Sequence, residues 1–394
     1  MRILQLTSSL PLSPSGSNAP FILHIARSLA ARGHEIHLVA PYHPKLDWPA
    51  REGEISFHFF RYAPLARWCI WGYGQSLQSD VSLKPGVFAL LPAAAVAAAV
   101  SLRRLQSRSR FDVLHAHWLL PNGPIASLAR RGLVPLVVSL HGSDVYVAGK
   151  GKAFRFAAKR ALRRAAAVVG CSEELVAGAR RIYQGERLYH TLPYGVDEEL
   201  FRPGEGVEAS TVTILAAGRL VEKKGFEILL RALGQMASPA RLSIAGSGDL
   251  RGRLEVVTAE LGLGDRVQFL GDLSQPEILK LYRSCAIFCL PSVRDSGGNV
   301  DGLPNVLLEA MSSGMAVAAS RVGGVPQVMR DGENGLLVDE KQPAALAAAL
   351  DALAGDVELR RRLGGAARRT ILDGFTWRLY AQRFEAILDS VSKS

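Results

Sequence analysis

Two acidic residues eight positions apart, Asp301 and Glu309, mark the stretch of this sequence best suited to bind a ligand. Asp301 lies in a loop rich in glycine, asparagine and aspartate, and Glu309 lies about one and a half turns inside the helix expected after it. The first N–H groups of a helix have no partner within the helix, so those of Asn305 and Val306 can bind an anion or a hydroxyl group. The two carboxylates therefore flank a helix end suited to a phosphate or a sugar hydroxyl.

A second group of candidate ligand-binding residues is cationic and follows a strand expected at 212–217. Arg219 comes directly after Gly218, and two lysines, Lys223 and Lys224, come just before the next predicted helix. An arginine can hold two phosphate oxygens at once, and a lysine adds a compact positive charge. This pattern favours phosphate binding and leaves both lysines open as candidates.

Three other positions follow predicted strands or open a helix, where ligands bind in open α/β sheets. Gly246, in a Gly-Ser-Gly turn, would let the backbone approach a ligand, although a tight turn alone explains such a glycine. His141 ends the strand expected at 134–140 and fits either a buried structural histidine or a residue that contacts a ligand. Gly16 and Ser17 precede the first predicted helix and fit either a plain turn or a ligand contact.

Alternating strands and helices are expected to position these residues. Apolar runs bounded by turn residues predict buried parallel strands, and periodic apolar positions between them predict helices. Strands are expected at 2–6, 36–40, 111–117, 134–140 and 165–171, and again at 212–217, 241–245, 266–270, 286–290 and 315–319. This alternation predicts an α/β fold with doubly wound parallel sheets.

The length of 394 residues favours two domains. A polar, turn-rich linker near Pro193–Gly204 marks the boundary between them. The sequence therefore predicts a first domain of residues 1–195 and a second domain of residues 196–375. An amphipathic helix is expected after Phe375.

The acidic pair resembles a known family motif. The run from Asp301 to Met311, Asp-Gly-Leu-Pro-Asn-Val-Leu-Leu-Glu-Ala-Met, is similar to the motif of family-four retaining glycosyltransferases, and Gly323-Gly324-Val-Pro326 follows it as in that family. Members of the family, which include enzymes of bacterial surface-polysaccharide synthesis, adopt the GT-B fold. The family usually carries glutamate where this chain has Asp301, which is one methylene shorter, and where it has Gln327.

The resemblance implies two Rossmann-like domains facing across a cleft, with the terminal helix at 376–394 crossing back to the first. It implies metal-independent hexosyl transfer, without a cofactor, from a UDP- or GDP-sugar to a glycan or lipid-linked acceptor. Glu309 would hold the nucleotide ribose and Asp301 the donor sugar, with His141 against that sugar from the other domain. Arg219 and Lys224 would hold the diphosphate. Further donor contacts would come from Gly246, Gly302, Leu303, Asn305 and Val306, and Gly16 and Ser17 would line the acceptor side.

Positive charge is concentrated in the first half of the chain. Residues 1–200 hold 24 lysines and arginines against 13 acids, which accounts for the whole net charge of +11. The segment Lys150–Arg164 contains seven basic residues and no acid, and helical spacing places Arg155, Lys159 and Arg163 on one side. The apolar run Val87–Val100 precedes four more arginines and is too short to span a bilayer.

These basic and apolar segments fit either a solvated surface over a core helix or contact with an anionic membrane. No nucleic-acid-binding motif accompanies the basic residues, and the short apolar start of the chain lacks the pattern of a cleavable signal. The sequence therefore favours a cytoplasmic protein held peripherally on the inner face of the plasma membrane, with no nucleic-acid partner.

Cysteine and histidine spacing gives no sign of a metal site. The four cysteines lack paired metal-type spacing and are expected to be free thiols. His115 and His117 share one face of a predicted strand without further ligands, which favours a packed or hydrogen-bonded role. Two other functions remain open on the same fold: a catalytically silent nucleotide-sugar-binding partner subunit, and a nucleotide-sugar epimerase.

Overall fold

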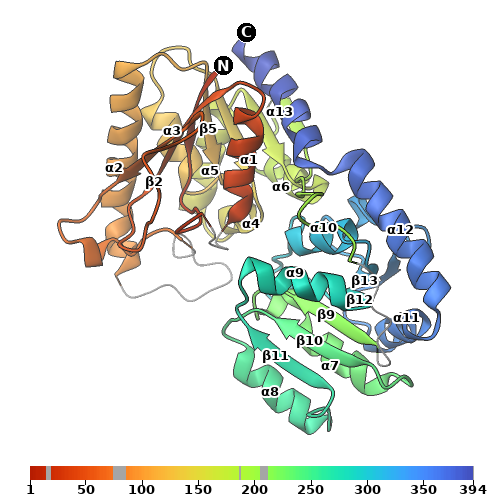
Figure 1. Ribbon diagram of the computed structural model, residues 1–394. Helices are drawn as coiled ribbons and strands as arrows, with labels where there is room; N and C mark the ends of the chain where they lie inside the picture. Colours follow the sequence, from red (N-terminus) through yellow and green to blue (C-terminus); the bar gives the residue numbers. More distant parts are fainter. Residues whose placement is uncertain (15–18, 74–85, 186–187, 205–211, 394) are drawn as a thin grey trace. The chain divides into compact units, whose positions relative to one another are not determined.

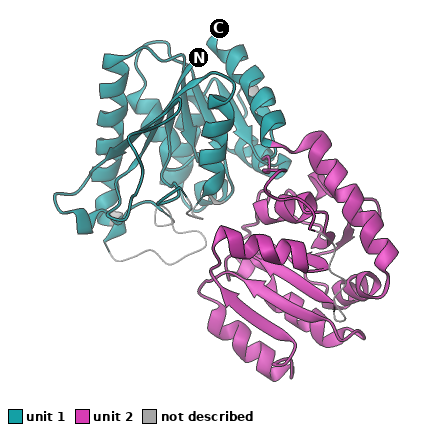
Figure 2. Ribbon diagram, viewed as in Figure 1, with its two compact units in different colours: residues 1–193, 377–394 teal, residues 194–376 magenta. Residues whose placement is uncertain are grey.

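The computed structural model describes residues 1–14, 19–73, 86–185, 188–204 and 212–393, and it divides into two compact units (Figure 2). Unit 1 consists of Met1–Pro193 and Trp377–Ser394, and unit 2 consists of Tyr194–Thr376. The division after Pro193 lies two residues before the boundary expected from the sequence.

Unit 1 is built on an eight-stranded sheet in the order β3-β4-β2-β1-β5-β6-β7-β8 (Figure 1). Its pairings are parallel apart from the short antiparallel pair β3–β4. The strands are β1 (Arg2–Leu6), β2 (Glu35–Pro41), β3 (Arg51–Glu52), β4 (Ile55–Phe60), β5 (Val113–His117), β6 (Leu136–Leu140), β7 (Ala167–Gly170) and β8 (Leu188–Thr191). The chain starts at β1 inside the sheet and winds first toward one edge and then toward the other, as predicted.

Helices cover this sheet in two groups. Helix α1 (Pro20–Ala30) packs beside the C-terminal helix α13 (Trp377–Ser392), which Figure 1 draws in red and blue. Helices α2 (Val87–Arg108), α3 (Asn122–Ala129) and α5 (Lys152–Arg164) contact one another in that order. Because strand crossovers are right-handed, the second group lies on the face opposite α1. The other elements of unit 1 are η1 (Ala66–Trp68), α4 (Ser143–Gly149) and α6 (Glu173–Ile182).

The apolar run Val87–Val100 and the first three of the four arginines after it form one helix, α2, which ends at Arg108. Ala94 and Ala98 are buried, whereas Val96 is 63% exposed. The run is therefore neither a wholly buried core helix nor a helix separate from the core, because one stripe packs while the opposite side faces solvent. Among the described residues, no helix combines the length and apolar character needed to cross a bilayer.

Unit 2 is built on a six-stranded parallel sheet in the order β11-β10-β9-β12-β13-β14. The strands are β9 (Thr213–Ala217), β10 (Arg241–Ala245), β11 (Val267–Gly271), β12 (Ile287–Leu290), β13 (Ala316–Ser320) and β14 (Leu336–Val338). The first five lie within one residue of their predicted positions. Strand β14 has three residues, too few to give a strand pattern in the sequence.

Helices of unit 2 bury their apolar stripes on this sheet. Leu229 and Leu233 of α7 and Leu350 of α11 share one buried cluster with Ile214 and Ile244 of the neighbouring strands β9 and β10. The helix after β11 begins with the predicted capping box, in which Ser274 N–H donates to the Glu277 carboxylate at 2.8 Å. The helices are η2 (Glu222–Lys224), α7 (Phe226–Gln235), α8 (Arg251–Glu260), α9 (Gln275–Ser284), α10 (Asn305–Ser312), η3 (Val325–Gln327), α11 (Pro343–Gly355) and α12 (Val357–Gly374).

Candidate functional site

The predicted ligand-binding residues of unit 2 gather at the carboxyl edge of its sheet. Strands β9 and β12 are neighbours, and the chain reverses its direction across the sheet between them. Arg219 follows β9, and the loop carrying Asp301 follows β12. Ligands bind at such a reversal in open α/β sheets, because the connections on either side diverge there.

Asp301 is held by both lysines of the segment after β9. Its Oδ1 lies 3.2 Å from Lys223 Nζ, and its Oδ2 lies 2.6 Å from Lys224 Nζ. The side chains of Asp301 and Lys223 are 14% and 6% exposed. Burial would raise the pKa of Asp301, but Lys224 and Lys223 outweigh burial and hold that pKa below its usual range. The cluster therefore has an ionised carboxylate shared by two ammonium groups.

The loop that carries Asp301 is tied to the same lysine segment through its backbone. Val293 N–H donates to the Lys223 carbonyl at 2.8 Å. The Glu222 carboxylate accepts hydrogen bonds from the N–H and the hydroxyl of Ser296, each at 2.8 Å. All three residues of η2 therefore hold this loop, which fixes Asp301 relative to the cations.

Two glycines after β13 pack directly against the backbone of the same loop. A Cβ at Gly323 would collide with the Asp301 carbonyl, and a Cβ at Gly324 would collide with the carbonyl of Gly302. Gly302 and the next residue, Leu303, are buried. The predicted Gly-Gly-Val-Pro segment is thus a close backbone support for the start of the acidic motif.

Gly246 supports the turn that carries Arg219. A Cβ at Gly246 would collide with the carbonyl of Gly218, and the φ of Gly246 is 130°, a value that favours glycine. Arg219 itself is exposed. This close approach explains the glycine structurally, and a direct ligand contact by Gly246 stays a prediction.

Helix α10 begins at Asn305, and Pro304 is its N-cap rather than part of its first turn. A proline before a helix commonly occupies the first helical turn, and Pro304 lies one position earlier. Pro304 has an extended ψ of 124°, while its carbonyl already accepts a hydrogen bond from Leu307 N–H at 3.1 Å. The N–H groups of Asn305 and Val306 therefore precede the first helical hydrogen bond, as predicted.

Glu309 is a half-buried carboxylate with a tyrosine partner. The Tyr282 hydroxyl, in α9, donates to Glu309 Oε2 at 2.8 Å. Burial raises the pKa of Glu309 to about 7, and the hydrogen bond from Tyr282 opposes that rise. Sequence reasoning missed Tyr282, because an aromatic residue inside an amphipathic helix has the pattern of an ordinary core residue.

In unit 1, His141 lies at the carboxyl end of β6, as predicted. Its Nε2 lies 3.1 Å from Nδ1 of His117. The ring packs against those of Phe21 and Trp118, with centroids 4.9 and 5.1 Å away. Burial, and less strongly His115, hold the pKa of His141 well below its usual range. The imidazole is therefore neutral and could donate or accept a hydrogen bond.

Asp144 fixes the turn after His141. Its carboxylate accepts from the backbone N–H groups of Leu119, Gly142 and His141, at 2.6, 2.9 and 3.3 Å. Burial raises the pKa of Asp144 to about 6, although these hydrogen bonds lower it. The sequence signal for this role is an aspartate three residues after a strand-end histidine, the spacing of a side-chain-to-backbone turn.

The predicted packed role of His115 and His117 is confirmed. Both are fully buried, and His115 Nε2 lies 2.7 Å from Ser139 Oγ on the neighbouring strand. Within the described ranges, no group of three or more histidine, cysteine, aspartate or glutamate residues could hold a metal ion. The four cysteines are free thiols, as expected.

The other predicted residues within the described ranges lie on α5 and η3. Arg155, Lys159 and Arg163 lie on the exposed side of α5 in unit 1. Gly16 and Ser17 lie outside the described residues. Gln327, in η3, has a buried Oε1 without a hydrogen-bond partner in the described part of the chain.

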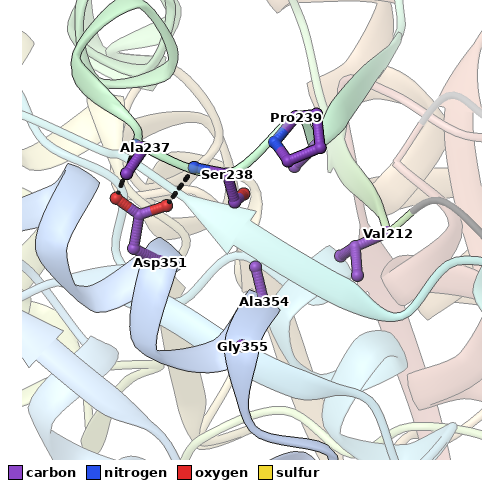
Figure 3. A pocket seen from close by; sticks show the side chains of 8 residues that line it. Val212, Ala237, Ser238, Pro239, Asp351, Ala354 and Gly355 are labelled. Atoms are coloured by element: carbon purple, nitrogen blue, oxygen red, sulfur yellow. Dashed lines mark hydrogen bonds between the residues drawn. The ribbon is translucent and has the colours of Figure 1, made fainter.

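A pocket of 460 Å³ opens at the opposite, amino edge of the unit 2 sheet (Figure 3). Val212, just before β9, and Asp351 of α11 are among its lining residues. The Asp351 carboxylate accepts from the N–H groups of Ala237 and Ser238 at 2.9 and 3.0 Å, as the dashed lines in Figure 3 show. This carboxylate therefore holds the connection between α7 and β10, away from the predicted site.

Two family models match the chain, "Glycosyl transferase 4-like domain" at residues 18–195 and "Glycosyl transferases group 1" at residues 197–370. The D-inositol 3-phosphate glycosyltransferase of Corynebacterium diphtheriae is 31% identical over 314 residues, which cover 71% of this chain and 70% of that protein. The GDP-mannose-dependent alpha-(1-6)-phosphatidylinositol monomannoside mannosyltransferase of Mycolicibacterium smegmatis is 28% identical over 322 residues, 76% of this chain and 81% of that protein.

A solved structure has the same fold. HepE of Anabaena, in complex with UDP and glucose, aligns with a TM-score of 0.76 and 20% identity over 99% of this chain and 100% of that chain. Together with the two doubly wound parallel sheets, this similarity identifies the fold as GT-B. The matched family models and the relative at 31% identity lead to one assignment: the chain belongs to the group 1 glycosyltransferases, with a glycosyltransferase 4-like first half.

Proposed function

We propose that this glycosyltransferase transfers a hexose from a UDP- or GDP-sugar to a glycan or lipid-linked acceptor in the assembly of a bacterial surface polysaccharide. The transfer retains the anomeric configuration and needs no metal ion. One observation carries the proposal: two lysines and Asp301 form a buried cationic cluster in the loop that leads into α10, at the chain reversal of the sheet. Positive charge and helical N–H groups at one sheet edge suit a diphosphate and the sugars on either side of it.

Arg219 and Lys224 take the leaving diphosphate in this mechanism. Negative charge on that group grows as the glycosidic bond breaks, so fixed cations stabilise the transition state more than the ground state. Asp301 holds Lys224 Nζ at 2.6 Å, and a cation fixed in this way needs little rearrangement during the reaction. Lys223 shares the same carboxylate at 3.2 Å and stays a second candidate.

The two carboxylates take the two sugars of the donor. Glu309 accepts hydrogen bonds from the ribose hydroxyls, and Asp301 accepts from hydroxyls of the transferred sugar. Among the described residues, the Glu309 carboxylate has one hydrogen bond, from Tyr282 to Oε2, so Oε1 is available to a ligand. Backbone groups of Gly302, Leu303, Asn305, Val306 and Gly246 complete the donor contacts, and neutral His141 of unit 1 contacts the transferred sugar.

The stereochemistry and the metal requirement can be measured without knowing the acceptor. With water as acceptor, hydrolysis of an α-linked UDP- or GDP-sugar should first release the α-anomer, visible by ¹H NMR before mutarotation. The rate should be unchanged in excess EDTA. Release of the β-anomer would overturn retention, loss of activity in EDTA would overturn metal independence, and an epimerised nucleotide-sugar would identify an epimerase instead.

Kinetics of the same reaction test the diphosphate role. Arg219→Ala and Lys224→Ala should each lower kcat on the order of a hundredfold while KM for the donor changes less, because the lost interaction is strongest in the transition state. Lys280→Ala removes an exposed lysine of α9 and should change neither constant. Wild-type kcat in both site variants would contradict the assignment.

The acceptor side is assigned to unit 1 and to a membrane surface. Helix α5 presents Arg155, Lys159 and Arg163 to solvent, together with Phe156, which is 69% exposed. Basic side chains beside an exposed aromatic ring suit an anionic lipid surface. The M. smegmatis relative is named for a phosphatidylinositol-linked acceptor, which supports a lipid-linked acceptor here.

A further inference from the structure

The Tyr282 side chain occupies a fixed position in the core of unit 2. It is 2% exposed, and its ring contacts those of Phe201 and Phe288, with centroids 5.6 and 6.0 Å away. The contact with Phe201 is edge-to-face, with an interplanar angle of 85°. Burial and two aromatic neighbours leave the ring little freedom, so the position of its hydroxyl is set by packing.

That hydroxyl joins helix α9 to Glu309 of helix α10. Tyr282 in α9 donates to Glu309 Oε2 at 2.8 Å, and it is the single hydrogen bond to this carboxylate in the described residues. A hydrogen bond to a charged acceptor is stronger than one between neutral groups. The tyrosine therefore restricts rotation of the carboxylate and leaves Oε1 for a ligand.

The surroundings of Glu309 otherwise favour its neutral form. Strand β13, which packs against α10, has the sequence Ala-Val-Ala-Ala-Ser and contributes no titratable group. Helix α12 contributes Arg368, whose Nη1 donates to the Ser312 carbonyl at 2.7 Å and to its hydroxyl at 2.9 Å. Burial raises the pKa of Glu309 to about 7, and Tyr282 is the group that opposes it.

We propose that Tyr282 is a positioning residue for the nucleotide: its hydroxyl holds the Glu309 carboxylate in the orientation and charge state that accept the ribose hydroxyls. This inference rests on the proposed ribose role of Glu309. A protonated Glu309 would lose one acceptor position and the charge that strengthens a hydrogen bond from ribose. Nucleotide binding thereby depends on a residue that contacts the Glu309 carboxylate and not the nucleotide itself.

The test compares nucleotide binding by wild type and Tyr282→Phe across pH 6 to 9.5. Calorimetry with UDP and GDP should show that loss of the hydroxyl moves the midpoint for ribose-dependent binding upward by about one to two pH units, the size expected for a hydrogen bond to a charged group. At pH 7 the variant should bind roughly five- to fifty-fold more weakly, and at pH 9.5 it should recover to within about threefold.

Matched controls separate positioning from a general packing defect. Tyr62→Phe removes another buried hydroxyl, which hydrogen-bonds the backbone of Trp71 in unit 1, and should leave the binding profile unchanged. The 2′,3′-dideoxy forms of both nucleotides lack the ribose hydroxyls and should bind wild type and Tyr282→Phe equally. An equal loss of affinity at every pH would reduce Tyr282 to a packing residue and overturn the proposal.

A ligand-free measurement keeps the inference distinct from the proposed function. In protein labelled with ¹³C at glutamate carboxyl carbons, the Glu309 signal is identified by its absence in Glu309→Gln. Its titration midpoint should rise in Tyr282→Phe relative to wild type, and an unchanged midpoint would overturn the inference whatever binds. A raised midpoint without binding of either nucleotide would instead refute the ribose assignment, and with it the proposed role of Tyr282.

Discussion

At the scale of single residues, the acidic motif combines two carboxylates in opposite electrostatic settings. Two lysines keep Asp301 ionised, with its pKa below the usual range despite burial. Glu309 has one tyrosine partner, and burial raises its pKa to about 7. Residue types and spacing indicate both acids in the sequence, but these differences depend on side chains from η2 and α9 that only the fold brings near.

The raised pKa of Glu309 predicts a pH-dependent cost to stability. The folded protein binds a proton at Glu309 up to about pH 7, whereas the unfolded chain releases it near the ordinary glutamate pKa of 4.5. Glu309 therefore makes its full contribution to the free energy of unfolding below pH 4.5. That contribution falls by up to about 3 kcal/mol as the pH rises toward 7. Glu309→Gln has no such titration.

The unfolding free energy of Glu309→Gln, relative to wild type, should consequently increase between pH 5 and pH 8 in urea titrations. Glu255→Gln is a suitable control, because Glu255 lies half exposed in an i,i+4 pair with Arg251. Its difference from wild type should stay within about 0.5 kcal/mol. A pH-independent difference for Glu309→Gln would contradict the raised pKa.

At the scale of elements, the parallel strands of unit 2 are predictable because each is a short apolar run between helices with apolar periodicity. The loop after β12 is less predictable, because its conformation depends on long-range contacts such as Val293 N–H to the Lys223 carbonyl. The same limit applies to the start of α10, where Pro304 caps the helix instead of entering it. Local pattern thus identifies the site segments, and tertiary contacts determine their geometry.

The Gly-Gly segment after β13 gives a prediction at this scale. Gly324 has an ordinary φ of −84°, so alanine is allowed by the backbone, yet its Cβ would collide with the Gly302 carbonyl. Gly324→Ala should therefore push the acidic loop away, destabilise unit 2 by roughly 1–3 kcal/mol and weaken nucleotide binding.

Gly252→Ala is the matched control for that substitution. Gly252 lies in α8, where an added Cβ meets no atom within 4 Å. Alanine there should be neutral or stabilising by about 0.4–1 kcal/mol, with nucleotide binding unchanged. Calorimetric binding and urea unfolding measure both effects, and equal behaviour of the two variants would show that the Gly324 contact has no functional role.

At the scale of the whole molecule, the two halves of the chain differ in charge. Residues 1–200 carry the entire excess of positive charge, whereas residues 201–394 contain 23 basic and 23 acidic residues. Unit 1 also exposes apolar side chains on the basic helices α2 and α5, including Val96 and Phe156. This asymmetry suits an acceptor-binding unit at a lipid surface and a donor-binding unit in solution.

The membrane proposal predicts charge-dependent co-sedimentation with liposomes. The protein should bind vesicles containing anionic phospholipid, bind neutral vesicles much less, and dissociate at high salt as the Debye length shrinks. Reversal of Arg155, Lys159 and Arg163 to glutamate should weaken binding at least about tenfold, since each cation contributes about 1 kcal/mol. Reversal of Arg253, Lys280 and Arg330 in unit 2 is the control. Equal binding to both vesicle types, or binding to neither, would show that Arg155, Lys159 and Arg163 form a solvated surface and not a membrane contact.

The central claim, a nucleotide-sugar site at the carboxyl edge of the unit 2 sheet, is tested most directly by thermal unfolding with a panel of UDP- and GDP-sugars. A true donor at about 100 times its Kd should stabilise the protein by about 2.7 kcal/mol, which raises Tm by roughly 5 °C or more. Glu309→Gln and Lys224→Ala should lose most of that shift, and Lys280→Ala should keep it. The site would be refuted if no member of the panel raised Tm, or if all three variants responded like wild type.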